Sequence, residues 1–162
     1  MLRELSRLTG LGQIPHLIAD HNYAGGGLNL LRKGGYLRIH VDGNWHDDRG
    51  VHRRLNLVLY LNGAWRPELG GARGFYDEAA TKVIGEYAPS GKRLVVFETH
   101  DKSFHRHTTL IDCPDDQFRS SLILYYCTAA RRPDGQVTVE QPHSALWRSK
   151  GWMDKRGNRM RS

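Results

Sequence analysis

Two polar side chains end an otherwise mostly apolar stretch at residues 36–42, which reads Tyr-Leu-Arg-Ile-His-Val-Asp. Successive side chains of a strand point to opposite faces, so His40 and Asp42 would share one face and Val41 would occupy the other. An imidazole and a carboxylate placed in this way are two ligands of a two-histidine, one-carboxylate site, which binds Fe(II) and leaves coordination positions open. Such a short pattern also suits a polar surface strand, so the prediction depends on a third ligand.

Candidates for that ligand follow in residues 103–107, which read Ser-Phe-His-Arg-His. If this segment opens a strand, His105 and His107 lie on the same face of it. The residue pattern therefore leaves both histidines open as the third ligand.

A candidate anion-binding group precedes the apolar segment at residues 122–126. Arg119 carries the planar fork of donors that best matches a carboxylate, and Ser121, on the same face of a strand, adds a hydroxyl donor. These two residues predict an anionic co-substrate if they face a pocket. The alternative is an arginine at a strand start in solvent.

The elements that must position these side chains are mostly short strands. Leu2, Leu5 and Leu8 are three residues apart, which predicts a short N-terminal helix. Beyond residue 28, short apolar segments alternate with Gly, Asn, Asp and Pro, a pattern typical of an all-β sandwich or barrel. The predicted strands are Leu28–Leu31, Tyr36–Val41, Leu55–Leu61, Gly74–Tyr76, Leu94–Phe97, Thr108–Ile111, Ser121–Thr128 and Val137–Val139.

Together these motifs resemble the iron(II)/2-oxoglutarate dioxygenases of the prolyl 4-hydroxylase type. The resemblance covers roughly residues 10–130 and rests on the order of five motifs: residues 36–42, residues 53–62 followed by Trp65, Gly70-Gly71, residues 103–105 and residues 119–126. It implies a mainly β protein with a double-stranded β-helix, or jelly roll, and a short N-terminal helix.

Residue by residue, the resemblance implies metal ligands at His40, Asp42 and His105. His107 is the alternative to His105, because similar family members often carry Gly between the two histidines where this chain has Arg106. The co-substrate residues implied are Arg119 and Tyr60 for the distal carboxylate, Ser121 as a further donor, and Tyr36 as a wall of the pocket.

A second departure is Arg73-Gly74, where relatives usually have apolar residues. These two residues could make room for a polar substrate or mark a bulge in the strand.

The cofactors implied are Fe(II), 2-oxoglutarate and O₂, with L-ascorbate as a further candidate. The expected reaction is hydroxylation of a C–H bond in a prolyl residue or small metabolite, with release of succinate and CO₂. Two alternatives stay open: a cupin-like metal-binding protein, which would not need Arg119 and Tyr60 to converge, and a non-catalytic basic interaction module.

Composition sets the limits of these interpretations. A chain of 162 residues is long enough for one domain, which we expect at residues 1–140. Of the net charge of +7, the last fifteen residues supply +5, and residues 141–162 are expected to form a basic, mobile tail, with nucleic-acid binding disfavoured. Two cysteines, no long apolar segment and no signal-like N-terminus favour a cytoplasmic protein without membrane contact.

Overall fold

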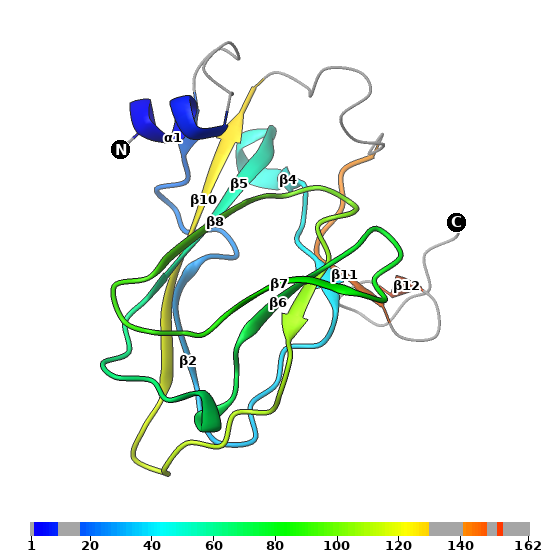
Figure 1. The fold of residues 1–162 in the computed structure, drawn as a ribbon. Coiled ribbons are helices and arrows are strands. Elements are labelled where there is room, and N and C mark those ends of the chain that lie inside the picture. Colours follow the sequence, from blue (N-terminus) through cyan, green and yellow to red (C-terminus); the bar gives the residue numbers. More distant parts are fainter. Residues whose placement is uncertain (1, 10–16, 130–140, 149–151, 154–162) are drawn as a thin grey trace.

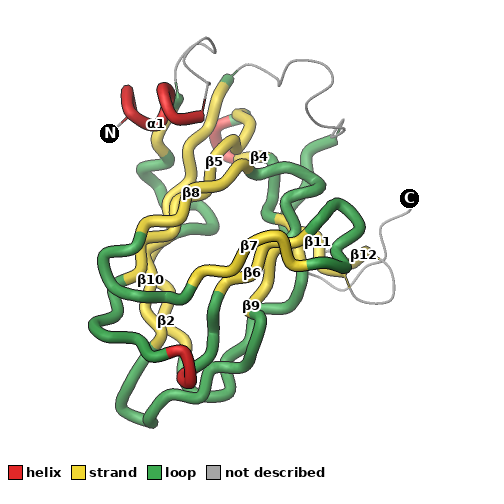
Figure 2. Tube along the Cα trace, in the orientation of Figure 1, coloured by secondary structure: helices red, strands yellow, loops and turns green. Residues whose placement is uncertain are grey.

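Two antiparallel sheets face one another in the computed structural model, which describes residues 2–9, 17–129, 141–148 and 152–153 (Figures 1 and 2). The first sheet contains β1 (Ile18–Ala19), β2 (Gly27–Leu31), β4 (Trp45–His46), β5 (Val51–Tyr60), β8 (Leu94–Glu98) and β10 (Arg119–Thr128). The second runs in the order β12 (Trp152–Met153), β11 (Leu146–Arg148), β3 (His40–Val41), β9 (His105–His107), β6 (Arg73–Tyr76) and β7 (Val83–Tyr87). The expected mainly β jelly roll is confirmed.

The helices are few and short among the described residues. Helix α1 (Leu2–Thr9) is the predicted N-terminal helix, and two 3₁₀ turns span Asp47–Arg49 and Pro67–Leu69. Leu5 of α1 packs on Leu55, Leu57 and Tyr126, on the face of the first sheet that points away from the second sheet. The helix therefore covers the outside of the sandwich.

The long strands β5 and β10 form the centre of the first sheet, with Tyr60 opposite Ser121 and Asn56 opposite Tyr125. Because side chains alternate along a strand, Asn56, Val58 and Tyr60 point inward while Leu55 and Leu57 point outward. Val58 and Tyr60 pack with Val95 and with residues of both sheets, among them Phe75, Phe97 and Ile123. This apolar cluster packs between the sheets, and Val58 and Ile123 stand between two polar inward pairs, Asn56 with Tyr125 and Tyr60 with Ser121.

The adjacent glycines 70 and 71 both require a left-handed backbone, with φ of +67° and +68°. A Cβ on Gly70 would lie 2.0 Å from the Leu110 carbonyl oxygen, and one on Gly71 would lie 3.0 Å from Cδ of Arg119. Glycine is needed here because the chain passes directly against the segment after β9 and against Arg119.

Most predicted strands are present, but two predictions were wrong. Residues 36–39 are not in a strand, and Thr108–Ile111 is a loop, because β9 ends at His107. Ile111 is buried in a separate cluster with Trp65, Leu69 and Cys113, so its apolar character reflects packing beneath a loop. The predicted strand Val137–Val139 lies outside the described residues.

Part of the basic C-terminal segment belongs to the second sheet. Strand β11 pairs with β3, placing Leu146 opposite Val41 and Trp147 opposite His40, and β12 pairs with β11. The positive charge of the C-terminal segment did not indicate that it would pair with this sheet. Residues 149–151 and 154–162 lie outside the described part of the chain.

Cys113 and Cys127 are both buried and carry free thiols. Over the described residues, the structure has no helix with the length and apolar character needed to cross a membrane.

Candidate metal and 2-oxo acid site

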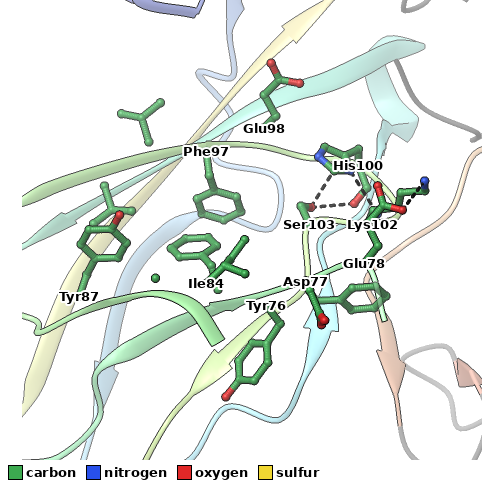
Figure 3. Close-up of a pocket in the computed structure, with 15 residues that line it drawn as sticks. Tyr76, Asp77, Glu78, Ile84, Tyr87, Phe97, Glu98, His100, Lys102 and Ser103 are labelled. Atoms are coloured by element: carbon green, nitrogen blue, oxygen red, sulfur yellow. Dashed lines mark hydrogen bonds and ion pairs between the residues drawn. The ribbon is translucent and has the colours of Figure 1, made fainter. Parts of the chain in front are cut away.

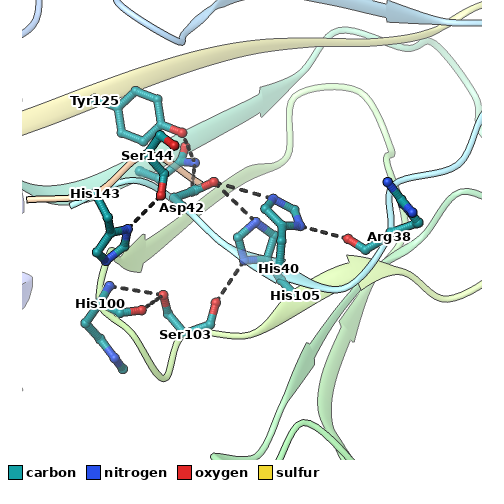
Figure 4. A network of polar contacts seen from close by, with 10 residues as sticks. Arg38, His40, Asp42, His100, Ser103, His105, Tyr125, His143 and Ser144 are labelled. Atoms are coloured by element: carbon teal, nitrogen blue, oxygen red, sulfur yellow. Dashed lines mark hydrogen bonds and ion pairs between the residues drawn. The ribbon is translucent and has the colours of Figure 1, made fainter. Parts of the chain in front are cut away.

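The three predicted metal ligands meet at one end of the space between the sheets (Figure 4). His40 on β3 is the cross-strand neighbour of His105 on β9, and Asp42 directly follows β3. One nitrogen of each imidazole and one oxygen of Asp42 lie within 4.8 Å of one another, and all three residues are buried.

Backbone carbonyls orient both imidazoles. Nδ1 of His40 lies 2.8 Å from the carbonyl oxygen of Arg38, and Nδ1 of His105 lies 2.9 Å from that of Ser103. Because a carbonyl only accepts, Nδ1 must be the protonated nitrogen of each ring, which leaves the Nε2 lone pair facing Asp42. The Nε2 atoms lie 3.5 Å (His40) and 3.7 Å (His105) from Oδ1 of Asp42.

Asn56 and Tyr125 hold the carboxylate from the opposite sheet. Nδ2 of Asn56 donates to Oδ2 of Asp42 at 2.7 Å and to the Tyr125 hydroxyl oxygen at 3.3 Å. Burial alone would raise the pKa of Asp42, but His105, His40 and the Asn56 hydrogen bond together lower it well below its ordinary value. The carboxylate is therefore ionised, as a metal ligand must be.

The structure distinguishes His105 from His107. Burial and then the neighbouring His40 lower the pKa of His105 to about 3, so its ring is neutral at pH 7. His107 is equally buried, but it does not belong to the three-residue cluster, and its Nδ1 has no hydrogen-bond partner. Burial and then Arg119 and Arg73 lower the pKa of His107 to about 2. His107 lines the same cavity as both of these arginines.

Arg119 and Tyr60 converge, as the resemblance implied. Arg119 is 1% exposed, its Nε donates to the Gly71 carbonyl oxygen at 2.7 Å, and its Nη2 donates to the Tyr60 hydroxyl oxygen at 3.3 Å. Ser121 lies across from Tyr60, and its buried hydroxyl has no partner. These three groups form a cluster of donors deep between the sheets.

One cavity of about 310 Å³ is lined by Arg119 and Ser121 and by the His40, Asp42 and His105 cluster. Tyr60 is fully buried behind Arg119 and does not line it. Tyr36 lines its wall and is 41% exposed, which places it at the opening. Trp147 of β11 also lines it and stacks on His40, with ring centroids 4.4 Å apart and an angle of 19°. Residues from both sheets and from the C-terminal segment thus enclose a single small-molecule site.

The residues fit a divalent metal and an anionic ligand. Protein ligands at about 2.0–2.2 Å from one ion stand roughly 3–4 Å apart, close to the observed separations. The Ser121 hydroxyl has no hydrogen-bond partner, and Arg119 forms no ion pair with any described carboxylate. Both groups therefore suit a ligand that brings its own carboxylate.

A larger cavity, of about 580 Å³, lies between strands β7 and β8 (Figure 3). Phe75 and Phe97 line it with mostly apolar neighbours, and their rings also approach His105 to 5.9 and 4.9 Å between centroids. None of the three clustered polar residues lines it. Its contribution to the site is apolar packing behind His105.

Sequence reasoning missed three residues of the site. Asn56 lies within the motif at residues 53–62 but was given no role of its own. Trp147 lies in the C-terminal segment, which was interpreted only from its charge. Arg73 was noted only as a departure, yet it is 4% exposed and lines the same cavity as Arg119. The available signal in the sequence was an arginine at the start of an otherwise apolar strand, because arginine is rarely buried without a reason.

A family profile that matches the chain agrees with this chemistry. A sequence profile described as the 2OG-Fe(II) oxygenase superfamily matches residues 21–127. Prolyl 3-hydroxylase OGFOD1 of Mus musculus is 35% identical over 65 residues, which cover 38% of this chain and 12% of that protein. A solved prolyl-4-hydroxylase of Pseudomonas putida is 24% identical, with a TM-score of 0.47, over 65% of this chain and 52% of that one. The chain thus spans much less than the full length of either relative.

Proposed function

Because this chain belongs to the 2OG-Fe(II) oxygenase superfamily, we propose that it is an Fe(II)- and 2-oxoglutarate-dependent dioxygenase that hydroxylates a C–H bond of its substrate. The observation that carries the proposal is the buried cluster of two imidazoles and one carboxylate, with both Nε2 atoms turned toward Asp42. A dicarboxylate-sized cavity leads from it to Arg119.

Each residue has a defined task in this proposal. His40, Asp42 and His105 hold Fe(II), and the backbone carbonyls of residues 38 and 103 keep the imidazoles in the ligating tautomer. Arg119 and Tyr60 bind the distal carboxylate of 2-oxoglutarate, with Ser121 as a further donor. When bound, the iron supplies oxidation by O₂, with 2-oxoglutarate converted to succinate and CO₂ and one oxygen atom transferred to the substrate.

The walls of the cavity exclude water and orient the substrate. Trp147 covers one face of His40, and Tyr36 lies at the opening, where a substrate enters. We propose a prolyl residue or a small metabolite as the substrate, since the mouse relative is a prolyl 3-hydroxylase.

The two free cysteines support a reducing, cytoplasmic location.

The test is succinate release with Fe(II), O₂, 2-oxoglutarate and ascorbate as a reductant. His40→Ala, Asp42→Ala and Arg119→Ala should each abolish or strongly reduce succinate formation. His21→Ala, which changes an exposed histidine outside the cavity, should leave it intact. Succinate formation that is equal in the parent and all three site variants would refute the proposal.

The same variants separate this function from a cupin-like metal-binding protein. A cupin-like protein would lose metal binding in His40→Ala but would bind no 2-oxoglutarate in any form. The proposed enzyme binds 2-oxoglutarate in the parent and loses that affinity in Arg119→Ala while it keeps the metal. Calorimetric titration without O₂ measures both affinities.

A further inference from the structure

Arg73 is a buried cation that the proposed reaction has not used. It lies on β6, opposite His107 of the neighbouring strand β9, and its side chain points inward. It is 4% exposed and lines the same cavity as Arg119. Its guanidinium carbon lies 5.9 Å from the centroid of the Phe97 ring.

Nothing in the described part of the chain neutralises this charge. Nε of Arg73 has no hydrogen-bond partner, and no described carboxylate lies within ion-pair distance of Arg73 or Arg119. The acidic residue that lines the cavity is Asp42, which the two imidazoles and Asn56 surround. A buried charge without a partner is strongly unfavourable, so two of them in one cavity indicate an anionic ligand.

The neighbours of Arg73 place it at the Arg119 end of the cavity. The register puts Arg73 beside His107 and puts Phe75 beside His105, so Arg73 lies one pleat farther from the metal cluster. Nε of Arg119 donates to the carbonyl oxygen of Gly71, which lies two residues before Arg73, and both arginines line the same cavity. Arg73 therefore lies at the Arg119 end of the cavity.

We infer that Arg73 is a second guanidinium that binds the distal carboxylate of the 2-oxo acid together with Arg119, and that it determines selectivity for a 2-oxo acid with a charged tail. This inference rests on the proposed function. The cavity lining carries Asp42 and three arginines, the buried Arg73 and Arg119 and the half-buried Arg53, whose charges sum to +2. A divalent metal raises this sum to +4. A 2-oxo dicarboxylate brings two negative charges, whereas an uncharged tail leaves both buried guanidinium groups without a carboxylate partner.

The test compares two ligands of equal chain length, 2-oxoglutarate and 2-oxopentanoate, which lacks the distal carboxylate. Each is titrated calorimetrically, without O₂, into the Mn(II)-loaded parent, Arg73→Met, Arg73→Lys and Arg106→Met. Arg106 is the matched control, because it is the next β9 residue after His105 but bonds the Tyr76 hydroxyl and does not line the cavity.

Arg73→Met should bind 2-oxoglutarate roughly 10- to 100-fold more weakly than the parent, as expected for a lost hydrogen bond to a charged group. Its affinity for 2-oxopentanoate should not fall, so the ratio of the two affinities collapses. Arg73→Lys should be intermediate, because it keeps the charge without the fork, and Arg106→Met should keep the parent ratio. An unchanged ratio in Arg73→Met overturns the inference.

Thermal unfolding gives a second readout. Removing an unpaired buried charge should raise or preserve the melting temperature of the ligand-free Arg73→Met protein and shrink the rise that 2-oxoglutarate produces. A variant that melts lower without ligand, yet gains as much from 2-oxoglutarate as the parent, overturns the inference. If the parent itself binds no 2-oxoglutarate, the proposed function fails as well, which distinguishes the two failures.

Discussion

Replacing Asn56 by leucine should weaken metal binding while the protein stays folded. Leucine has nearly the shape of asparagine but cannot donate the 2.7 Å hydrogen bond to Oδ2 of Asp42. Asn56 is 2% exposed, so bulk water has little access to replace this donation. The carboxylate would then lose the partner that fixes its orientation toward the two imidazoles.

The size of the effect follows from the charge of the acceptor. A buried hydrogen bond to an ionised group contributes about 1.5–3 kcal/mol. At about 1.4 kcal/mol per tenfold change in affinity, this range corresponds to a metal affinity roughly 10- to 100-fold weaker. Outer partners of metal ligands in other proteins have effects of about the same size.

The measurement is Mn(II) affinity, obtained from the EPR signal of free Mn(II) in equilibrium with the protein. Asn62→Leu is the matched control, because Asn62 is also buried near the end of β5 but donates to the Phe118 carbonyl oxygen, away from the cavity. The control should lose stability and keep the parent's metal affinity. If Asn56→Leu folds and binds Mn(II) as tightly as the parent, Asn56 does not orient the carboxylate.

Three further outcomes are expected. Equilibrium dialysis should show Mn(II) binding lost in His105→Ala and kept in His107→Ala, since only His105 belongs to the three-residue cluster; equal losses would contradict this geometry. Gly71→Ala should cost about 1–3 kcal/mol of stability in chemical unfolding and weaken 2-oxoglutarate binding, because φ is +68° and the new methyl would press on Arg119; an unperturbed variant would contradict this packing. His143 donates from both ring nitrogens, and although burial lowers its pKa, its hydrogen-bonded carboxylate partner raises it above the ordinary 6.5. The protonated His143 therefore stabilises the fold below about pH 6.5, and this contribution is lost as the pH rises through its raised pKa. In urea unfolding, the stabilities of the parent and of His143→Gln should differ at low pH and converge at high pH. A difference that does not change with pH would contradict this prediction.

The spacing of His40 and Asp42 was sufficient to predict that they lie together, because two residues of separation put side chains on one side of an extended chain. Asp42 lies just beyond β3, yet the rule holds. The alternation along β5 likewise places Asn56, Val58 and Tyr60 on its inward face. Such local patterns are reliable here because the backbone period itself places the side chains.

Local pattern could not choose between His105 and His107, since both share one face of β9. The choice appears only when β9 is paired with β3, which puts His105 and not His107 opposite His40. The incorrect strand at Thr108–Ile111 has a related cause. An apolar stretch indicates that side chains are buried but not that the backbone is a strand. Ile111 is buried beneath a loop and not within a sheet.

The sequence by itself determined the class of fold and the residue types of the site, because strand periodicity, turn residues and ligand chemistry are local properties. Only the tertiary structure decided which side chains meet. Asn56 reaches Asp42 from the opposite sheet, Trp147 reaches His40 from the C-terminal segment, and Arg73 joins Arg119 inside one cavity. These contacts depend on pairing between distant strands and on the packing of two sheets, which no periodicity along the chain encodes.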